Sequence, residues 1–315
     1  MILVDGATGY LGSHLTERLL SEGRAVRCLV RPGARSEDVD LLKKMGAEVV
    51  EGALTDKNAA EYFNGCQYAV HLIGSIAPKK NESFVELHQS LTRRFVASAR
   101  IALCKKIILV TALGAAKDAP SQYHRTKWLA EEEFRASDIP FTILRPSLLI
   151  GRTIGARNSK LVSRLTSLIQ NKSVVPLVNG GLNKIQPIFI KDCVEAISKC
   201  ISPEFAGETI ELGGSTVLSM RRFVEELQEL VGKKKPIVNL HPQAGKLLAA
   251  VMEMVQDVPT LSSDQVVLSM HDNICHSNGL VTIIDRQASS LDAALDTYRS
   301  NPIGTFIPAS PQKTS

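Results

Sequence analysis

The 315-residue sequence predicts an α/β fold: a doubly wound parallel sheet with helices on both faces, joined to a small carboxy-terminal α/β lobe. Two observations lead to this class. Short apolar runs alternate with amphipathic segments over the first 150 residues, as they do in consecutive βαβ units. A glycine turn, with Gly6, Gly9 and Gly12 spaced three apart, separates the first apolar run from the first helical pattern. Together they indicate a sheet of the Rossmann type.

The elements of the first half follow from hydrophobic periodicity. Leu11, Leu15 and Leu19 share one face of the first helix, whereas the unbroken apolar runs 107–110 and 141–144 are typical of strands buried on both faces. The same criteria give strands at 2–5, 25–31, 47–52, 68–74, 105–112 and 141–147, and helices at 11–22, 36–46, about 82–104 and 121–137.

The pattern loosens after Gly151. We expect helices at 161–170, 220–231 and about 245–256, a strand that turns into a helix over 185–201, and a strand at 208–214. Ser262 and Gln265 fit a capping box at the start of a further helix. The sequence therefore divides into a dinucleotide-binding domain (1–151 with 184–213), a smaller lobe for substrate or partner (152–183 with 214–307) and a flexible tail (308–315).

Composition excludes several classes of protein. The net charge of +5 is spread along the chain without a basic, aromatic-interleaved stripe, so we expect no nucleic-acid partner. The six cysteines show no CxxC or zinc spacing, which predicts buried thiols and no metal site. No apolar run approaches the ~18 residues of a spanning helix, and a strand begins at Ile2, so a cytoplasmic protein is expected. For "KLLAAVMEMV" a core-facing amphipathic helix is favoured over peripheral contact with a membrane or partner.

The glycine turn predicts a nucleotide site. Gly6 permits the tight turn, Gly9 lets the backbone approach a pyrophosphate, and Gly12 allows the helix to pack on the sheet. The following helix presents free N–H groups and the positive end of its dipole to the phosphates.

The residue after the second strand bears on cofactor choice. A carboxylate there accepts a hydrogen bond from a ribose 2′-hydroxyl, whereas a guanidinium binds a 2′-phosphate. This position is Arg31, with Arg35 nearby, so NADP(H) is favoured over NAD(H). Glu37 or Asp38 could still serve NAD(H).

Tyr123 and Lys127 are the candidate catalytic pair. They are four residues apart in one expected helix and therefore share a face. A nearby ammonium favours the phenolate, which predicts that Lys127 lowers the pKa of Tyr123 and prepares it to exchange a proton with a substrate oxygen. Thr111, at the carboxyl end of the fifth strand, could orient the same oxygen. His71, in an apolar strand, is expected to be a bonded core residue, and His124 a surface residue.

Several motifs in sequence order carry a family resemblance. "GATGYLG", "YHRTK" and "ILRPSLLIG" resemble the extended and atypical short-chain dehydrogenase/reductase superfamily. "TALGA", the segment 121–151 and "IQPIFIKDCVEAI" look most like the branch that contains the nucleotide-binding accessory subunit of respiratory complex I and its bacterial relatives. The resemblance implies a Rossmann domain that binds NAD(P)H, a small carboxy-terminal lobe, and either a small-molecule substrate or a partner of the respiratory-complex type.

The resemblance also implies roles for individual residues. It assigns the pyrophosphate to Gly6, Thr8, Gly9, Tyr10 and Leu11, the 2′-phosphate to Arg31, the adenine to Leu54, the adenosine ribose to Leu72, Ile73 and Gly74, the nicotinamide ribose to Lys127, and the nicotinamide pocket to Pro146 and Ser147. Three positions depart from the family pattern: Asp5 where Thr is usual, Ala53 where Asp is common, and Thr111 where Ser is general. The first two are expected to weaken nucleotide binding slightly.

Three functions remain open at this point. The set of Thr111, Tyr123 and Lys127 favours an NADPH-dependent oxidoreductase that acts on a carbonyl or quinone-type molecule. The branch resembled, and the lack of a polar cluster in 152–182, support a protein that binds NADP(H) without turning it over, as an assembly factor, structural subunit or redox sensor. A nucleotide-sugar epimerase or dehydratase that retains NAD would use the same triad, although Arg31 and the short lobe argue against it.

Overall fold

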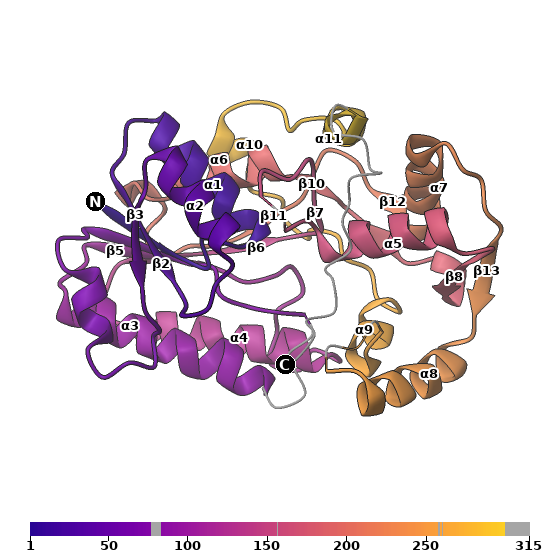
Figure 1. Ribbon diagram of the computed structural model, residues 1–315, viewed down its shortest axis with the longest axis horizontal. Coiled ribbons are helices and arrows are strands. Elements are labelled where there is room, and N and C mark those ends of the chain that lie inside the picture. The colour runs from indigo at the N-terminus through magenta and orange to yellow at the C-terminus, as the bar shows by residue number, and fades with distance from the viewer. Residues whose placement is uncertain (77–82, 156, 258, 260, 300–315) are drawn as a thin grey trace.

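A central parallel sheet organises the molecule. The structure is a computed structural model that describes residues 1–76, 83–155, 157–257, 259 and 261–299. Its main sheet has seven strands in the order β11-β6-β5-β4-β1-β2-β3, every pair of them parallel (Figure 1). The strands are β1 (Ile2–Asp5), β2 (Val26–Val30), β3 (Glu48–Glu51), β4 (Tyr68–His71), β5 (Lys106–Val110), β6 (Phe141–Pro146) and β11 (Thr209–Leu212). This is the predicted doubly wound Rossmann-type fold.

Helices cover both faces of this sheet (Figure 1). One face carries α1 (Tyr10–Ser21), α2 (Ser36–Met45), α6 (Ile190–Lys199) and α10 (Leu280–Ile284), and the other carries η1 (Ala59–Phe63), α3 (Leu91–Ile101) and α4 (Gln122–Arg135). Alternate residues of one strand enter different cores: Ile108 packs with Leu15, whereas Ile107 packs with Phe134. The unbroken apolar strands therefore have the predicted burial on both faces.

A second group of elements, called the lobe below, lies beyond the carboxyl ends of the main strands (Figure 1). It comprises α5 (Lys160–Asn171), β8 (Val175–Val178), α7 (Met220–Val231), β13 (Ile237–Leu240), α8 (Pro242–Val255) and α9 (Ser263–Leu268), with β13 parallel to β8. Its core joins α5, α7 and α11 (Leu291–Arg299) through side chains such as Val162, Phe223 and Tyr298. The capping box of Ser262 and Gln265 at α9 is confirmed.

Short elements connect the two parts. They are η2 (Glu86–Ser90), β7 (Leu149–Ile150), η3 (Asn179–Gly181), β9 (Lys184–Ile185), β10 (Ile188–Phe189), η4 (Pro203–Phe205) and β12 (Leu218–Ser219). One helix differs from the sequence-based expectation. The long helix expected over 82–104 contains a π-helical turn at Glu86–Ser90 and ends at Ile101, and its expected first residue lies outside the described residues. Helix α10 packs on α6, in the core on one face of the main sheet.

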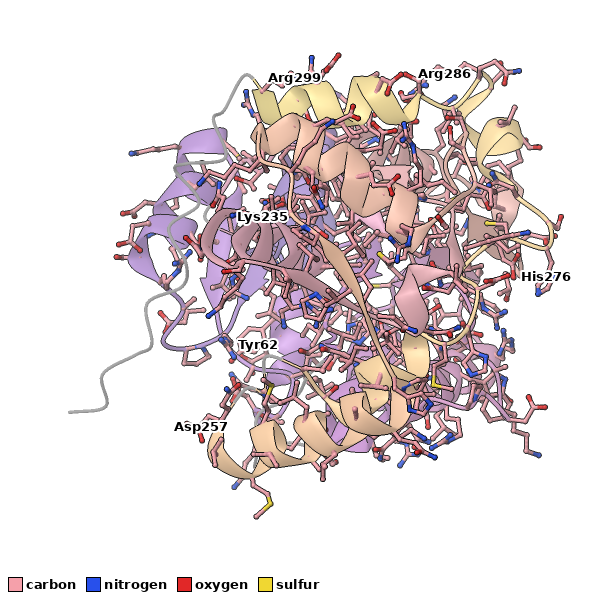
Figure 2. The ribbon with its side chains drawn as sticks, turned by 90° about the vertical axis from the view of Figure 1, so that its right-hand side faces the viewer. Tyr62, Lys235, Asp257, His276, Arg286 and Arg299 are labelled. Carbon is pink, nitrogen blue, oxygen red and sulfur yellow. The ribbon has the colours of Figure 1, made fainter. Side chains whose placement is uncertain are left out.

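Helix α8 does not face the core as the sequence suggested. Leu247, Met254 and Val255 are 70%, 73% and 75% exposed, while the small residues Gly245 and Ala249 are buried. In both views α8 forms the lower edge of the lobe, and Asp257, just past its end, lies at that edge (Figure 2). The apolar face of α8 is therefore turned outward. Among the described residues, no helix combines the length and hydropathy required to cross a bilayer.

Candidate functional site

The β1–α1 turn forms a close-fitting backbone cradle. Gly6 has a φ of +61°, and the N–H of Gly9 donates to its carbonyl oxygen at 2.8 Å. A Cβ on Gly12 would lie 2.6 Å from the Cα of Ala7 and would overlap the carbonyl oxygen of Gly6. The first turn of α1 has the sequence Tyr-Leu-Gly-Ser, without an acidic side chain. Its free N–H groups therefore fit the diphosphate of a dinucleotide.

Asp5 has a different role from the one its position suggested. Its carboxylate is fully buried, accepts from the backbone N–H of Leu72 at 2.7 Å and hydrogen-bonds Nδ1 of His71. His71 bonds Thr92 at 3.0 Å through Nε2, so it is the predicted core histidine. Because these bonds engage both carboxylate oxygens, Asp5 joins β1 to the end of β4. The expectation that it would oppose phosphate binding finds no support in this arrangement.

The ends of three strands meet at one edge of the sheet. Leu72 and Ile73, after β4, lie against Gly6, where an added Cβ would be 3.3 Å from Leu72. At the β6 end, Pro146 accepts from the N–H of Leu113 at 3.0 Å, and the buried hydroxyl of Ser147 donates to the carbonyl of Gln186. The structure thus brings the predicted ribose and nicotinamide segments to the same edge as the glycine turn.

Two predicted cofactor residues direct their side chains toward other parts of the protein. Leu54 is 4% exposed and packs in the core with Phe63, which leaves little surface for an adenine. The hydroxyl of Tyr10 donates to the carbonyl of Gly151 at 2.7 Å, and burial raises its pKa well above the ordinary value, with a further contribution from Tyr298. The backbone, and not the phenol, of Tyr10 is therefore the part available to a phosphate.

The pKa of Tyr123 was predicted in the wrong direction. Its ring lies at the start of α4, with ring centres 5.5 Å from His88 and 6.2 Å from Phe84. Burial, and secondly the charge of Asp264, raise the pKa of Tyr123 to about 12. The phenol is therefore protonated at neutral pH, and it is a weaker acid than an exposed tyrosine.

Lys127 is buried one turn further along the same helix face. A Cβ on Gly74 would lie 2.5 Å from its Nζ, so the amine sits directly beside the backbone that follows β4. Burial lowers the pKa of Lys127 to about 8, opposed by the carboxylates of Glu131 and Asp5. The amine is thus a charged donor at neutral pH. The resemblance assigned the nicotinamide ribose to this residue.

Thr111 makes its hydrogen bond within the protein. Its hydroxyl donates to Oε1 of Glu131 at 2.8 Å. The same buried carboxylate accepts a bidentate pair from Arg145 at 2.8 and 2.6 Å and a further bond from Arg135 at 2.8 Å. Thr111 is thus one donor in a buried charge network that fixes the α4 segment just after Lys127.

Sequence reasoning missed His88, which lies in the π-helical turn η2. The backbone N–H of Ser75 donates to Nε2 of His88 at 3.3 Å, so Nδ1 carries the proton and donates to Thr126 at 2.8 Å. Burial and the charge of Lys127 lower the pKa of His88 to about 2. Neutral His88 therefore links the β4 end to α4 between Tyr123 and Lys127. A π-helical turn often marks a functional site, but a helical hydrophobic pattern does not reveal one.

His124 also differs from expectation. It packs against the loop after β5, where a Cβ on Gly114 would lie 2.9 Å from its ring, and burial lowers its pKa to about 4. His124 is therefore a partly buried residue, and the prediction of a surface side chain was wrong.

The parallel sheet, the glycine turn and the free helix N-terminus define a Rossmann-type dinucleotide-binding protein. A family model described as NAD(P)H-binding matches residues 6–173, more than half of the chain. The chain belongs to this NAD(P)H-binding family.

Curated and solved proteins extend the comparison. The chain is 28% identical to the mitochondrial NADH dehydrogenase [ubiquinone] 1 alpha subcomplex subunit 9 of Arabidopsis thaliana, with 96% of this chain and 76% of that protein covered. It is 32% identical to the ceramide reductase of Caulobacter vibrioides, over 64% of this chain and 62% of the reductase. The NADPH complex of an Escherichia coli NADPH-dependent quinone oxidoreductase has the same fold, with a TM-score of 0.73 and 22% identity over 94% of this chain and 99% of that one.

Proposed function

We propose that this protein is an NADP(H)-dependent oxidoreductase that transfers hydride between the nicotinamide and a carbonyl or quinone-type small molecule. One observation carries the proposal. Tyr123 and Lys127 share a face of α4, and the amine of Lys127 lies beside Gly74 at the carboxyl edge of the sheet. Ligands of open α/β sheets bind at this edge.

The protonation states favour the direction of reduction. A nicotinamide held at this edge would supply the hydride for reduction of a carbonyl carbon. Tyr123, whose pKa is about 12, then donates its proton to the substrate oxygen and recovers one from solvent. Lys127, with a pKa of about 8, stays charged at neutral pH and stabilises the transient phenolate. Thr111 acts indirectly, because its bond to Glu131 fixes the helix that carries both groups.

The cofactor would lie along the strand ends. We propose that the diphosphate is held by backbone groups of Gly6, Thr8, Gly9, Tyr10, Leu11 and Gly12, and the 2′-phosphate by Arg31. The adenosine ribose would contact Leu72, Ile73 and Gly74, the nicotinamide ribose Lys127, and the nicotinamide Pro146 and Ser147. The side chain of Leu54 is buried, so we propose that only its backbone contacts the adenine. The exposed guanidinium of Arg31 at the end of β2 supports NADP(H) over NAD(H). A relative named ceramide reductase supports an apolar, lipid-like carbonyl substrate.

Turnover of NADPH tests the proposal. Purified protein is mixed with NADPH and a panel of quinones and apolar carbonyl compounds, and the loss of nicotinamide absorbance is followed. Wild type should turn over at least one compound, Tyr123→Phe should lose turnover while still binding NADPH, and the distant Tyr68→Phe should behave as wild type. If no compound reacts, or Tyr123→Phe reacts as fast as wild type, the catalytic proposal fails.

A second candidate is a nucleotide-binding subunit that does not turn over its nucleotide. The outward apolar face of α8 and the engaged hydroxyl of Thr111 support it, as does similarity to a protein named as a subunit of NADH dehydrogenase. On this hypothesis α8 contacts a respiratory-complex-type partner or a membrane surface. A co-purified nucleotide that never exchanges its hydride, with Leu247→Glu abolishing partner binding, would favour this candidate over the first.

The thiols bear on cellular location. Each of the six cysteines, all of them within the described residues, is a free thiol, and five are buried. This supports a reducing compartment, and we retain the cytoplasm as our proposal.

A further inference from the structure

Arg157 connects the start of the lobe to helix α2. It lies three residues before α5, yet its Nε is 3.8 Å from Oδ2 of Asp38. Gly155, two residues earlier, also lies near α2. A Cβ on this glycine would be 3.2 Å from Leu41 and 3.7 Å from Oδ1 of Asp38. Gly155 and Arg157, which follow β7, therefore both lie near α2 before α5 begins.

Asp38 already binds a second arginine. Arg35 donates to it from Nε at 3.1 Å and from Nη2 at 3.3 Å, and the carboxylate side chain is only 5% exposed. One nearly buried carboxylate thus faces two guanidiniums that come from different parts of the chain.

Arg31 lies in the turn that leads to Arg35, because its carbonyl oxygen accepts from the N–H of Ala34 at 3.2 Å. The pKa of Arg157 is lowered by burial first and also by the charges of Arg31 and Arg35, whereas Asp38 raises it. Lys160 is a further cation near Arg157: its pKa is lowered by burial first and then by the charge of Arg157. Glu37 is the other nearby acid, and it acts on Arg35. The cluster of three arginines is therefore only partly neutralised by Asp38 and Glu37.

We propose that Arg157 completes, with Arg31 and Arg35, a composite site for the 2′-phosphate of NADP(H), in which Asp38 holds the guanidiniums in place. This inference rests on the proposed NADP(H) function and goes beyond Arg31, the residue that the family resemblance supplies. The ligand class is a nucleotide with a 2′-phosphomonoester. Its dianion offers several acceptors to three guanidiniums, and when Lys160 is counted its charge balances the excess of positive charge over Asp38 and Glu37.

Binding at this site would also affect where α5, the first helix of the lobe, begins relative to the main sheet. Arg157 leads directly into α5, and Lys160 in the first turn of α5 reaches Ser75 at the β4 end, with Nζ to Oγ at 3.2 Å. A phosphate bound by Arg157 would therefore hold the start of α5 near Gly74 and Ser75. NADP(H) should stabilise this arrangement, whereas NAD(H) has no group that can reach Arg157.

Equilibrium binding tests the composite site without reference to turnover. The Kd values of NADPH and NADH are measured by nucleotide fluorescence for wild type, Arg157→Ala and Lys172→Ala. The control removes the same charge at the far end of α5, roughly 18 Å along the helix axis. Arg157→Ala should weaken NADPH by about 10-fold or more, as expected for lost charged hydrogen bonds, and leave NADH unchanged. Lys172→Ala should bind both as wild type does.

Further outcomes separate this inference from the proposed function. If wild type binds NADH as tightly as NADPH, the NADP(H) assignment itself fails. If wild type prefers NADPH and Arg31→Ala loses that preference but Arg157→Ala keeps it, the composite site is wrong and the proposed function stands. Asp38→Asn should retain the preference for NADPH. A selective loss of NADH binding in that variant would instead make Asp38 a ribose ligand and overturn the inference.

Discussion

Asp264 of α9 accepts a hydrogen bond from the backbone N–H of Tyr123 at 3.0 Å, and its other oxygen accepts from that of Gln122 at 2.6 Å. A carboxylate of the lobe thus caps the helix that carries the proposed acid, alongside the N-cap Ser121, which accepts from His124 at 3.1 Å. Negative charge is favourable at a helix N-terminus. The same charge helps to raise the pKa of Tyr123, so one residue affects both the stability of α4 and the acidity of the phenol.

Replacing Asp264 should separate these two effects. Asp264→Ala removes the acceptors and should lower the free energy of unfolding by about 1–2 kcal/mol in urea titrations. Asp264→Asn keeps one acceptor and should retain more of that stability. Both variants remove the charge, so both should lower the pKa of Tyr123, followed as tyrosinate absorbance against a Tyr123→Phe background. An unchanged phenol titration in both variants would contradict the electrostatic link.

Substitutions of Thr111 test whether its hydroxyl holds α4 in place through Glu131 or contacts the substrate oxygen. Thr111→Val leaves Glu131 without one donor in a buried network and should cost about 1–2 kcal/mol in unfolding free energy. Thr111→Ser keeps the hydroxyl and should cost less. NADPH binding should persist in both variants, because the hydroxyl points to Glu131. If Thr111→Val abolished turnover at full stability, a direct role at the substrate oxygen would replace the one assigned here.

Short-range features of the site could be predicted from the sequence. The glycine turn, the strand that precedes it and the Tyr123–Lys127 pair each depend on spacing within a few residues. Backbone geometry converts such spacing into position: four residues make one helical turn, and parallel strands end at one edge. The main sheet and most helix bounds were predicted for the same reason.

Long-range contacts could not be predicted in this way. Asp264 reaches Tyr123 across 141 residues of sequence, and Arg157 reaches Asp38 through a segment without a periodic pattern. Burial reversed the expected pKa shift of Tyr123. Sequence spacing indicated that Lys127 lies near the phenol, but it could not indicate that folding removes the phenol from water. Periodicity identified α8 as amphipathic but not its direction: Gly245 and Ala249 permit close packing, so the large side chains face outward.

Buried histidines should make the fold sensitive to acid. The pKa of His88 is about 2 in the folded protein against an ordinary 6.5, so below pH 6.5 the unfolded chain binds a proton that the folded chain does not. The stabilisation is complete above pH 6.5 and is lost as the pH falls, by up to about 1.4 kcal/mol per pH unit. Urea unfolding between pH 7 and 5 should show the free energy of unfolding falling with pH. In His88→Asn this slope should be smaller by the contribution of one bound proton. Equal slopes in the two proteins would show that His88 is charged in the folded state.

Two glycine-to-alanine substitutions should have opposite effects. In Gly12→Ala the new methyl group would overlap Gly6 and Ala7, so the turn must shift, and the unfolding free energy should fall by about 1–3 kcal/mol. NADPH affinity should fall with it, because the displaced backbone holds the diphosphate. Gly245→Ala adds the same methyl group in α8, where the nearest atoms are 3.5 Å away. It should raise stability by up to about 1 kcal/mol through helix propensity and leave nucleotide binding unchanged. Thermal unfolding with and without NADPH measures both effects, and tight NADPH binding by Gly12→Ala would place the nucleotide elsewhere.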